Sequence, residues 1–494
     1  MNPRSKLPGA ISAVLAGALI LSSCGPSSSS IKSLSGKRIS TAEMEASITE
    51  IMEQAGITGL SCAVINDGKI VFRKAFGFRD NKTGVANNEE TVFAGASFSK
   101  TVFAYLIMRM VGEGTIDLDK PLEDYLDRPL PALPNYADLA ADKRYRRITA
   151  RMVLSHTTGF PNWRWLNPDD KLSILYDPGY RFSYSGEGYA LLQMVVERIT
   201  GKDLEALSRR YIFDPLQMNR TSFVWRERFE DNTARPHNEY QVPLPLRKRR
   251  EAGAAGSLFT TAGDYARLLT AILNAQGRER TLLGKMVRPQ IRITSERMFG
   301  PGASRDTNAL AALNLSWGLG WGLFDSAYGH AFFHTGHDTG WQNYTVTYPD
   351  KNIGLVLLSN SDNFESAAEK LAERIIGDTY SPFTWLGYVP YDPDRKRTPR
   401  PLRPVISLAP EVLRKYEGVY VFADDKTFTV QLDNGRLVGS LSGQDGMELS
   451  AETESRFFIK GINVVIEFLL DDEGAAVKAV LTAEGVEFQA PKIR

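Results

Sequence analysis

Hydrophobic and polar positions along the chain predict a sheet built from both ends of one large domain, with helices between them. Apolar residues fill 60–65 and 70–76, and an Asn-Asp-Gly-Lys turn joins them, which predicts a β-hairpin. Helical spacing, with start and stop residues, predicts helices over 41–54, 98–111, 189–199 and 262–275. Strand-like runs return at 344–348 and 353–358. The simplest packing is an α/β (α+β) fold, with the sheet flanked by helices.

A second pattern begins after residues 388–404, which are rich in proline and basic residues and predict a linker. Short alternating runs follow, with Asn-Gly and Asp-Glu-Gly as turns between some of them. They lie at 418–422, 427–432, 436–441, 456–459, 464–469 and 477–482. This pattern predicts a small antiparallel β-barrel or sandwich over 405–494.

The N-terminus has the features of an export signal. Arg4 and Lys6 precede an apolar run, 10–21, that is too short to span a bilayer comfortably. The following Leu-Ser-Ser-Cys resembles a bacterial lipobox, in which Cys24 would carry the lipid. We therefore expect a lipoprotein signal peptide over 1–24 and a Ser-rich tether over 25–40. The protein would be lipid-anchored to a membrane of the bacterial cell envelope, facing the periplasm or exterior. An ordinary signal peptide with an incidental cysteine is the alternative.

Composition narrows the function classes. The chain has 494 residues, enough for two or three domains, with 43% hydrophobic and 24% charged residues, as in soluble globular proteins. A net charge of +1 provides no general attraction for nucleic acid, so no nucleic-acid partner is expected. The other cysteine, Cys62, lies in an apolar run and is predicted to be a buried strand thiol, which leaves the mature chain without a disulfide.

The first candidate for chemistry is Ser97-Phe98-Ser99-Lys100, where an extended segment turns into an apolar helix. A helix start concentrates unpaired N–H groups near the serine, and residues at i and i+3 share one face, so the lysine amine can reach the hydroxyl. A lysine in an apolar cleft can lose its proton and act as a base. The plainer interpretation is a helix-capping serine with a surface lysine.

Two further segments supply candidate groups. Tyr184 follows a turn and precedes a helix, a position that can project a phenol into a cleft, where a nearby protonated lysine would lower its pKa. In His334-Thr335-Gly336-His337, the glycine lets a ligand approach the backbone, and a strand edge can offer an N–H to an oxyanion. The alternative for Tyr184 is a core side chain that packs its ring.

The histidines also raise a metal hypothesis, with His330, His334 and His337 as ligands. It is disfavoured because no Asp, Glu or Cys cluster completes a site, and because the His-x-x-x-His spacing lies on strand-like sequence. No metal or cofactor is therefore expected. The triplet Lys82-Thr83-Gly84 precedes the serine and is expected to form a loop.

Together and in this order, the three segments resemble those of the penicillin-binding-protein-like serine hydrolases, the fold shared with class C β-lactamases. The resemblance spans roughly residues 41–380 and implies one hydrolase domain over 41–387. It is carried by Ser97–Lys100, by Tyr184 to Gly186, and by His334 to Gly336 in the place of Lys-Thr-Gly. Leu-Ser-His-Thr-Thr-Gly at 154–159, with His156 taken as structural, and Trp-Gly-Leu-Gly-Trp at 317–321 also agree.

The resemblance implies acyl transfer to small-molecule or peptide-like esters or amides. Ser97 would be the nucleophile, Lys100 and Tyr184 would move its proton, and the N–H groups of Ser97 and His337 would bind the oxyanion. His334 would hold Tyr184 or touch substrate.

Two departures favour an esterase or peptidase over an efficient β-lactamase. Gly186 stands where an asparagine is expected, which removes an amide that would orient a peptide-like substrate. His334 replaces a lysine, which weakens the positive charge that faces a β-lactam carboxylate. The alternatives are a weakly active or inactive binding protein of the same fold and, less favoured, a metal-dependent hydrolase.

Overall fold

The computed structural model describes residues 30–167, 170–392, 404–422, 426–441, 446–459, 464–483 and 486–493. The predicted signal peptide, Cys24 and most of the predicted linker lie outside these residues.

The predicted hairpin is present as β3 (Gly59–Asn66) and β4 (Lys69–Asp80). It belongs to an antiparallel sheet in which β3 pairs with β13, so the first and last parts of the domain meet at its centre. This confirms the sheet built from both ends. Its order is β5 (Val85–Ala86), β4, β3, β13 (Ile353–Ser359), β12 (Trp341–Tyr348), β11 (Gly329–Asp338), β10 (Gly322–Ser326), β9 (Ser316–Trp317) and β8 (Ile291–Arg292).

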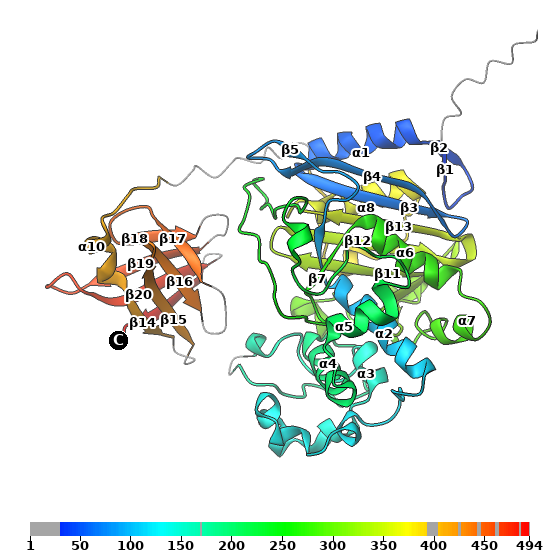
Figure 1. The fold of residues 1–494 in the computed structure, drawn as a ribbon, viewed down its shortest axis with the longest axis horizontal. Coiled ribbons are helices and arrows are strands. Elements are labelled where there is room, and N and C mark those ends of the chain that lie inside the picture. Colours follow the sequence, from blue (N-terminus) through cyan, green and yellow to red (C-terminus); the bar gives the residue numbers. More distant parts are fainter. Residues whose placement is uncertain are drawn as a thin grey trace, which may run out of the picture.

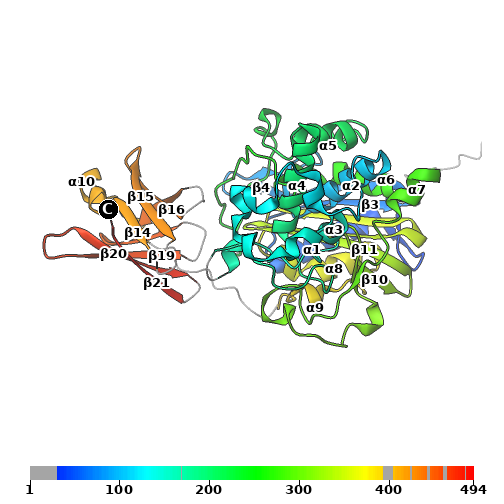
Figure 2. The same ribbon diagram turned by 90° about the horizontal axis from the view of Figure 1, so that it is seen from below.

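Helices cover both faces of this sheet (Figures 1 and 2). One face carries α1 (Thr41–Ala55) and α8 (Ala368–Ile376), which contact each other, and the other carries α6 (Ala262–Leu273), packed on β3 and β13. Beside α6 lies α2 (Phe98–Gly112), whose side chains are buried on almost every side because the helix is apolar all round. The remaining helices of this domain are α3 (Ala150–Leu154), α4 (Gly186–Thr200), α5 (Leu204–Ser208), α7 (Gly277–Leu283) and α9 (Phe383–Leu386).

The hydrolase domain includes residues before the predicted boundary at 41. Residues 30–40, predicted to belong to a flexible tether, form a hairpin of β1 (Ser30–Lys32) and β2 (Arg38–Ser40). Ile31 and Leu34 are buried, and the Leu34 N–H donates to the Ile376 carbonyl (2.8 Å). The serine-rich composition predicted a flexible segment, but the two apolar residues Ile31 and Leu34 pack this segment against the domain. At the other end, Tyr391 is buried against the domain, which therefore extends past residue 387.

The C-terminal part has its own apolar core, which includes Tyr416, Phe457 and Phe468. Its strands form an antiparallel meander, and Tyr420 near one edge pairs with Lys492 near the other, so the sheet is a nearly closed barrel. This confirms the predicted small β-barrel. After α10 (Pro410–Leu413) the strands are β14 (Gly418–Val421), β15 (Thr427–Asp433), β16 (Arg436–Leu441), β17 (Met447–Ala451), β18 (Arg456–Ile459), β19 (Val464–Leu470), β20 (Ala476–Ala483) and β21 (Val486–Pro491).

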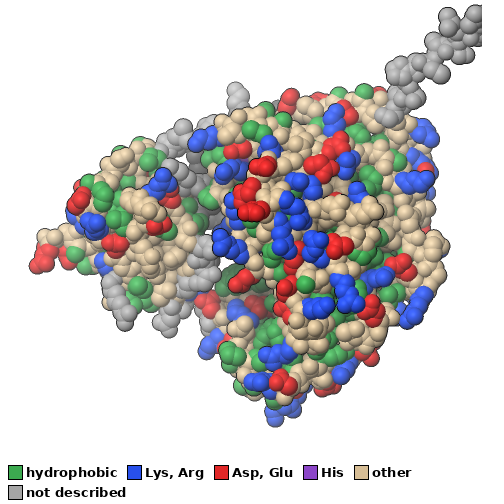
Figure 3. Space-filling model, in the orientation of Figure 1, with side chains coloured by type: hydrophobic (Ala, Val, Ile, Leu, Met, Phe, Trp, Pro, Cys, Tyr) green, Lys and Arg blue, Asp and Glu red, His purple; other side chains and the backbone are tan. Residues whose placement is uncertain are grey.

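Within the described ranges, no helix combines the length and the apolar character needed to cross a membrane. Cys62 is a buried free thiol in β3, as predicted. On the face shown in Figure 3, basic and acidic side chains of the large domain are interspersed.

Candidate active site

Ser97 is presented by a sharp turn between β6 (Phe93–Ala96) and α2. Ala96 adopts a left-handed backbone conformation (φ 46°), which a residue other than glycine rarely adopts. Ser99 holds the turn, because its hydroxyl donates to the Ala96 carbonyl (2.6 Å) and accepts from the N–H of Leu258 (2.9 Å) in β7 (Leu258–Thr260). The turn places Ser97 at the N-terminus of α2, as the sequence predicts.

Lys100 is fully buried one turn later. Its Nζ lies 3.1 Å from Ser97 Oγ and donates a hydrogen bond to the Ala255 carbonyl (2.6 Å). Removing the ammonium from water disfavours the charged form, and this burial lowers the pKa of Lys100 to about 7. A large fraction of the amine is therefore neutral near pH 7, with a lone pair within reach of the Ser97 proton.

Tyr184 lies over the lysine, with its ring centre 4.9 Å from Lys100 Nζ. Burial raises the pKa of Tyr184, and the Ser97 side chain partly opposes this through a hydrogen bond. The direction is opposite to the sequence-based expectation, because desolvation of the phenol outweighs the hydrogen bond with Ser97. The phenol thus keeps its proton near neutral pH and is suited to donating it.

His156 holds the segment that carries Tyr184. Its carbonyl accepts from the N–H of Ser183 (2.7 Å), and its Nδ1 accepts from the N–H of Ser185 (3.0 Å). Its ring lies against that of Tyr184, with centroids 4.2 Å apart. The sequence indicated only a structural turn residue here. Both residues next to Tyr184 in sequence are hydrogen-bonded to His156, so this histidine positions the phenol.

The third segment lies on β11, beyond the end of its pairing with β10. β10 pairs with Gly329 to Phe333, whereas β12 continues along β11 to Asp338. We call residues 334–338 of β11 the β11 overhang. They pair with β12 on one edge only, and β11 also contacts β6 and α2. In an antiparallel strand alternate N–H groups point to opposite edges, so the overhang can offer donors toward Ser97.

β11 approaches β6 so closely at position 336 that only glycine fits there. A Cβ at this position would overlap the carbonyl oxygen of Gly95 in β6 and press on the Asn343 side chain, so a larger residue would push β11 away from the serine turn. Thr335 precedes it on the same overhang.

The two histidines of this segment differ. His334 is buried, and burial, together with the charge of Lys100, lowers its pKa to about 3; its Nδ1 lies 2.6 Å from the Thr335 carbonyl. It is therefore a neutral imidazole, 6.3 Å from the Tyr184 ring between centroids. The His337 side chain is directed to Glu365 (2.8 Å), whose hydrogen bond raises the pKa of the imidazole.

The histidines of the metal hypothesis have separate partners. His330 contacts Asp325 (2.9 Å) and the Val287 carbonyl, whereas His334 and His337 have the contacts given above. Among the residues that the structure describes, no three His, Cys, Asp or Glu side chains come together as a metal site would require.

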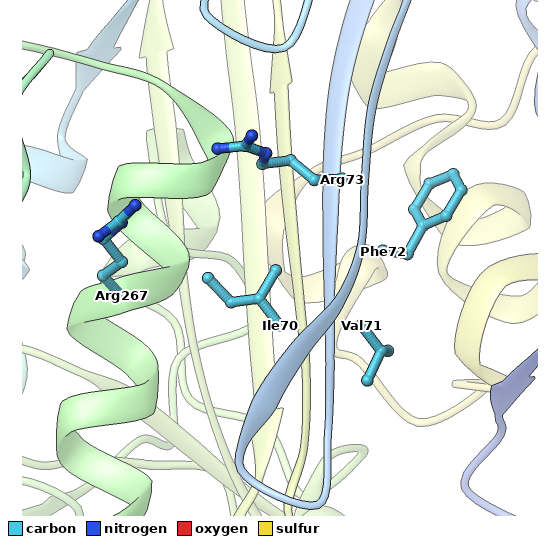
Figure 4. A pocket seen from close by; sticks show the side chains of 5 residues that line it. All are labelled: Ile70, Val71, Phe72, Arg73 and Arg267. Atoms are coloured by element: carbon cyan, nitrogen blue, oxygen red, sulfur yellow. The ribbon is translucent and has the colours of Figure 1, made fainter.

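A surface depression lies away from this cluster, between β4 and α6 (Figure 4). Ile70, Arg73 and Arg267 line it together with Val71 and Phe72. Arg73 is engaged by Glu89 (2.9 Å), and none of the lining groups is a nucleophile or a general base. We do not assign the chemistry to this depression.

Comparison with known proteins agrees with the geometry. The chain is 25% identical to penicillin-binding protein 4* of Bacillus subtilis over 457 residues, which cover 86% of this chain and 93% of that protein. It is 27% identical to the esterase EstB of Burkholderia gladioli over 234 residues, covering 42% of this chain and 57% of EstB.

Solved structures share the fold. An octameric penicillin-binding protein homologue from Pyrococcus abyssi matches with a TM-score of 0.56 and 22% identity, over 92% of this chain and all of that one. The D-alanine carboxypeptidase AmpC from Burkholderia cenocepacia matches with a TM-score of 0.55 and 20% identity, over 68% of this chain and 99% of that one. The sequence profile of the β-lactamase family matches residues 44–378, which include Ser97, Tyr184 and the β11 overhang. The chain therefore belongs to the β-lactamase family of serine hydrolases.

Proposed function

We propose that this hydrolase cleaves esters through an acyl-enzyme on Ser97, with Lys100 as the base. The observation that carries the proposal is the buried Lys100 amine, with a pKa of about 7, 3.1 Å from the Ser97 hydroxyl. A lysine with an ordinary pKa would be protonated at neutral pH and could not accept the proton.

In the proposed acylation, Ser97 Oγ attacks the ester carbonyl while its proton passes to the neutral Lys100 amine. The N–H groups of Ser97 and His337 stabilise the negative charge on the carbonyl oxygen. As the tetrahedral intermediate collapses, the bond to the alcohol breaks and Tyr184 donates its proton to the departing oxygen, recovering one from Lys100. Water then attacks the acyl-enzyme along the same proton path and releases the acid.

Esters are favoured over β-lactams for two reasons. Gly186 carries no side chain to bind an amide, and the neutral His334 presents no positive charge to a carboxylate. The similarity to the esterase EstB, and to a teichoic acid D-alanine hydrolase of Staphylococcus aureus at 23% identity over 227 residues, supports ester chemistry.

A substrate comparison tests this preference. Purified protein should hydrolyse p-nitrophenyl acetate with a kcat/KM at least roughly tenfold above that for nitrocefin and benzylpenicillin, because ground-state recognition of the carboxylate is missing. Initial rates measured spectrophotometrically on one preparation give the comparison. Faster turnover of either β-lactam than of the ester would contradict the assignment.

Tyr184→Phe tests the proton relay. The variant keeps the ring that packs on His156 and Lys100 but loses the phenolic proton. For an alkyl ester such as ethyl butyrate, whose departing alkoxide needs that proton, kcat should therefore fall by roughly 10²-fold. The thermal unfolding midpoint, measured alongside, should change little. Full activity in this variant would remove Tyr184 from the proton path.

We also propose that the protein is lipid-anchored through Cys24 in the bacterial cell envelope, on the evidence of the lipobox-like segment. In a bacterial expression host, Cys24→Ala should move the protein from the membrane fraction to the soluble fraction or stall its processing. Fractionation and immunoblotting, with the wild type in parallel, provide the readout. Membrane association and a processed size that are both the same in the two proteins would refute the anchor.

A further inference from the structure

We infer that Trp163 and Phe299 form an aromatic wall at the active site that selects esters with a planar apolar group next to the scissile bond. The inference rests on the proposed function and specifies its substrate class.

The first observation concerns the space beside Gly186. A Cβ added to Gly186 would lie 2.6–2.8 Å from three atoms of the six-membered ring of Trp163. The indole thus occupies the place that a side chain at position 186 would need. Gly186 follows Tyr184 by two residues, so the missing polar side chain has been replaced by an aromatic surface at the same point of the site.

The indole is held in this place by its own loop. The N–H of Gly186 donates to both the carbonyl and the side-chain oxygen of Asn162 (2.9 and 3.0 Å). Arg164, on the other side of Trp163, pairs with the buried Glu187 (2.8 Å). Both neighbours of Trp163 are therefore tied to the first turn of α4, and the ring is presented with little conformational freedom to lose on binding.

Part of the wall is exposed to solvent. Trp163 is half-buried, and Trp165 stacks on it with ring centroids 4.7 Å apart and planes within 9°. Trp165 remains 53% exposed. Such an exposed pair of stacked indoles is an apolar surface that an aromatic ligand can extend.

Phe299 supplies the second, independent observation. Its ring meets the Tyr184 ring edge to face at 5.3 Å, yet 48% of the residue is exposed. An apolar ring that is half in solvent and touches the proposed proton donor lies where a bound substrate would pass. Aromatic side chains from two separate parts of the chain therefore lie against the Tyr184 segment, Phe299 at the Tyr184 ring and Trp163 at Gly186.

Three esters test the inference, each followed by acid release at constant pH. Vinyl acetate has no ring, vinyl benzoate has a ring on the acyl side, and phenyl acetate has one on the alcohol side. Each variant is compared with the wild type on the same ester, so the intrinsic reactivity of the ester cancels. Trp163→Ala and Phe299→Ala should each lower kcat/KM for at least one aromatic ester by roughly tenfold, the size of a lost aromatic contact, with vinyl acetate changed by less than about threefold.

Two controls accompany the measurement. Phe488→Ala removes an exposed ring from β21 of the C-terminal barrel and should change none of the three esters. Trp163→Phe keeps an apolar ring and should retain part of the preference. Phe299→Ala alters an exposed residue, so it reports on the wall even where Trp163→Ala impairs folding.

The outcomes separate the two proposals. If the wild type cleaves esters but neither Trp163→Ala nor Phe299→Ala changes the ratio between aromatic esters and vinyl acetate, the wall is refuted while the esterase assignment stands. If the wild type cleaves no ester and Ser97 cannot be acylated, the proposed function and the wall fail together.

Discussion

Replacing Ser97 by alanine is expected to reduce hydrolysis of p-nitrophenyl acetate to the uncatalysed rate, a loss of at least roughly 10³-fold. Without the hydroxyl, Lys100 has no side-chain nucleophile to deprotonate. Ser97 caps the helix without a side-chain hydrogen bond to its backbone, so the substitution should leave stability nearly unchanged.

Ser407→Ala provides the matched control, since this exposed serine lies in the C-terminal part of the chain. It should retain wild-type activity. Residual activity of Ser97→Ala close to that of Ser407→Ala would mean that another group attacks the ester.

Lys100→Met should reduce kcat by roughly 10²- to 10⁴-fold, the range for loss of a general base. Methionine is similar in length and apolar, so it fits the buried site and avoids the cost of burying an ammonium. Because Ser97 and Lys100 act as one unit, the double variant should be little worse than either single variant. Steady-state kinetics on the four proteins give the test.

The pH dependence of kcat/KM tests whether Lys100 is the general base. Burial lowers its pKa to about 7, so the neutral form gains population as the pH rises through that value. For the wild type, kcat/KM should therefore rise between about pH 6 and pH 8 and then level off. The small residual rate of Lys100→Met should lack this rise. A variant that keeps both the rate and the inflection would assign the base to another group.

Lys82→Ala is the matched control for this experiment. Lys82 begins a Lys-Thr-Gly triplet in an exposed turn after β4, and its loss should change neither kcat nor the pH profile. An effect as large as that of Lys100→Met would show that the site has been misplaced.

The sequence predicted the parts of the fold whose pattern is local. The hairpin of β3 and β4 and the helix α2 agree with the structure within a few residues, because their apolar periodicity and turn residues are unambiguous. In the barrel, β17 and β21 were not predicted. Glu448 and Glu487 interrupt these short strands with charge, and only pairing with neighbouring strands defines them.

The site was predicted less completely than the fold. Ser97 and Lys100 are one helical turn apart, so their proximity follows from local geometry, and the structure places Tyr184 over them. The Ala255 carbonyl that accepts from Lys100 is 155 residues away in sequence, and a backbone oxygen has no sequence signature. The direction of the Tyr184 pKa shift also depends on burial, which spacing alone does not reveal.

Trp163 is a second example of a tertiary contact that the sequence did not reveal. The sequence showed that position 186 lacks its expected asparagine, but it gave no indication of what fills the space. Only the tertiary contact with the indole identifies the replacement. The sequence showed that the asparagine is missing at position 186, but it did not show that Trp163 fills its place.

Covalent labelling of the nucleophile tests the central claim most directly. The protein is treated with a fluorophosphonate, digested, and mapped by mass spectrometry with fragmentation that separates Ser97 from Ser99. We predict a single adduct on Ser97, absent from Ser97→Ala, formed much more slowly in Lys100→Met and unaffected by EDTA. An adduct on a different residue would contradict the assignment of Ser97 as the nucleophile. Ester hydrolysis that survives in Ser97→Ala and is abolished by EDTA would contradict it too, and would favour a metal-dependent hydrolase.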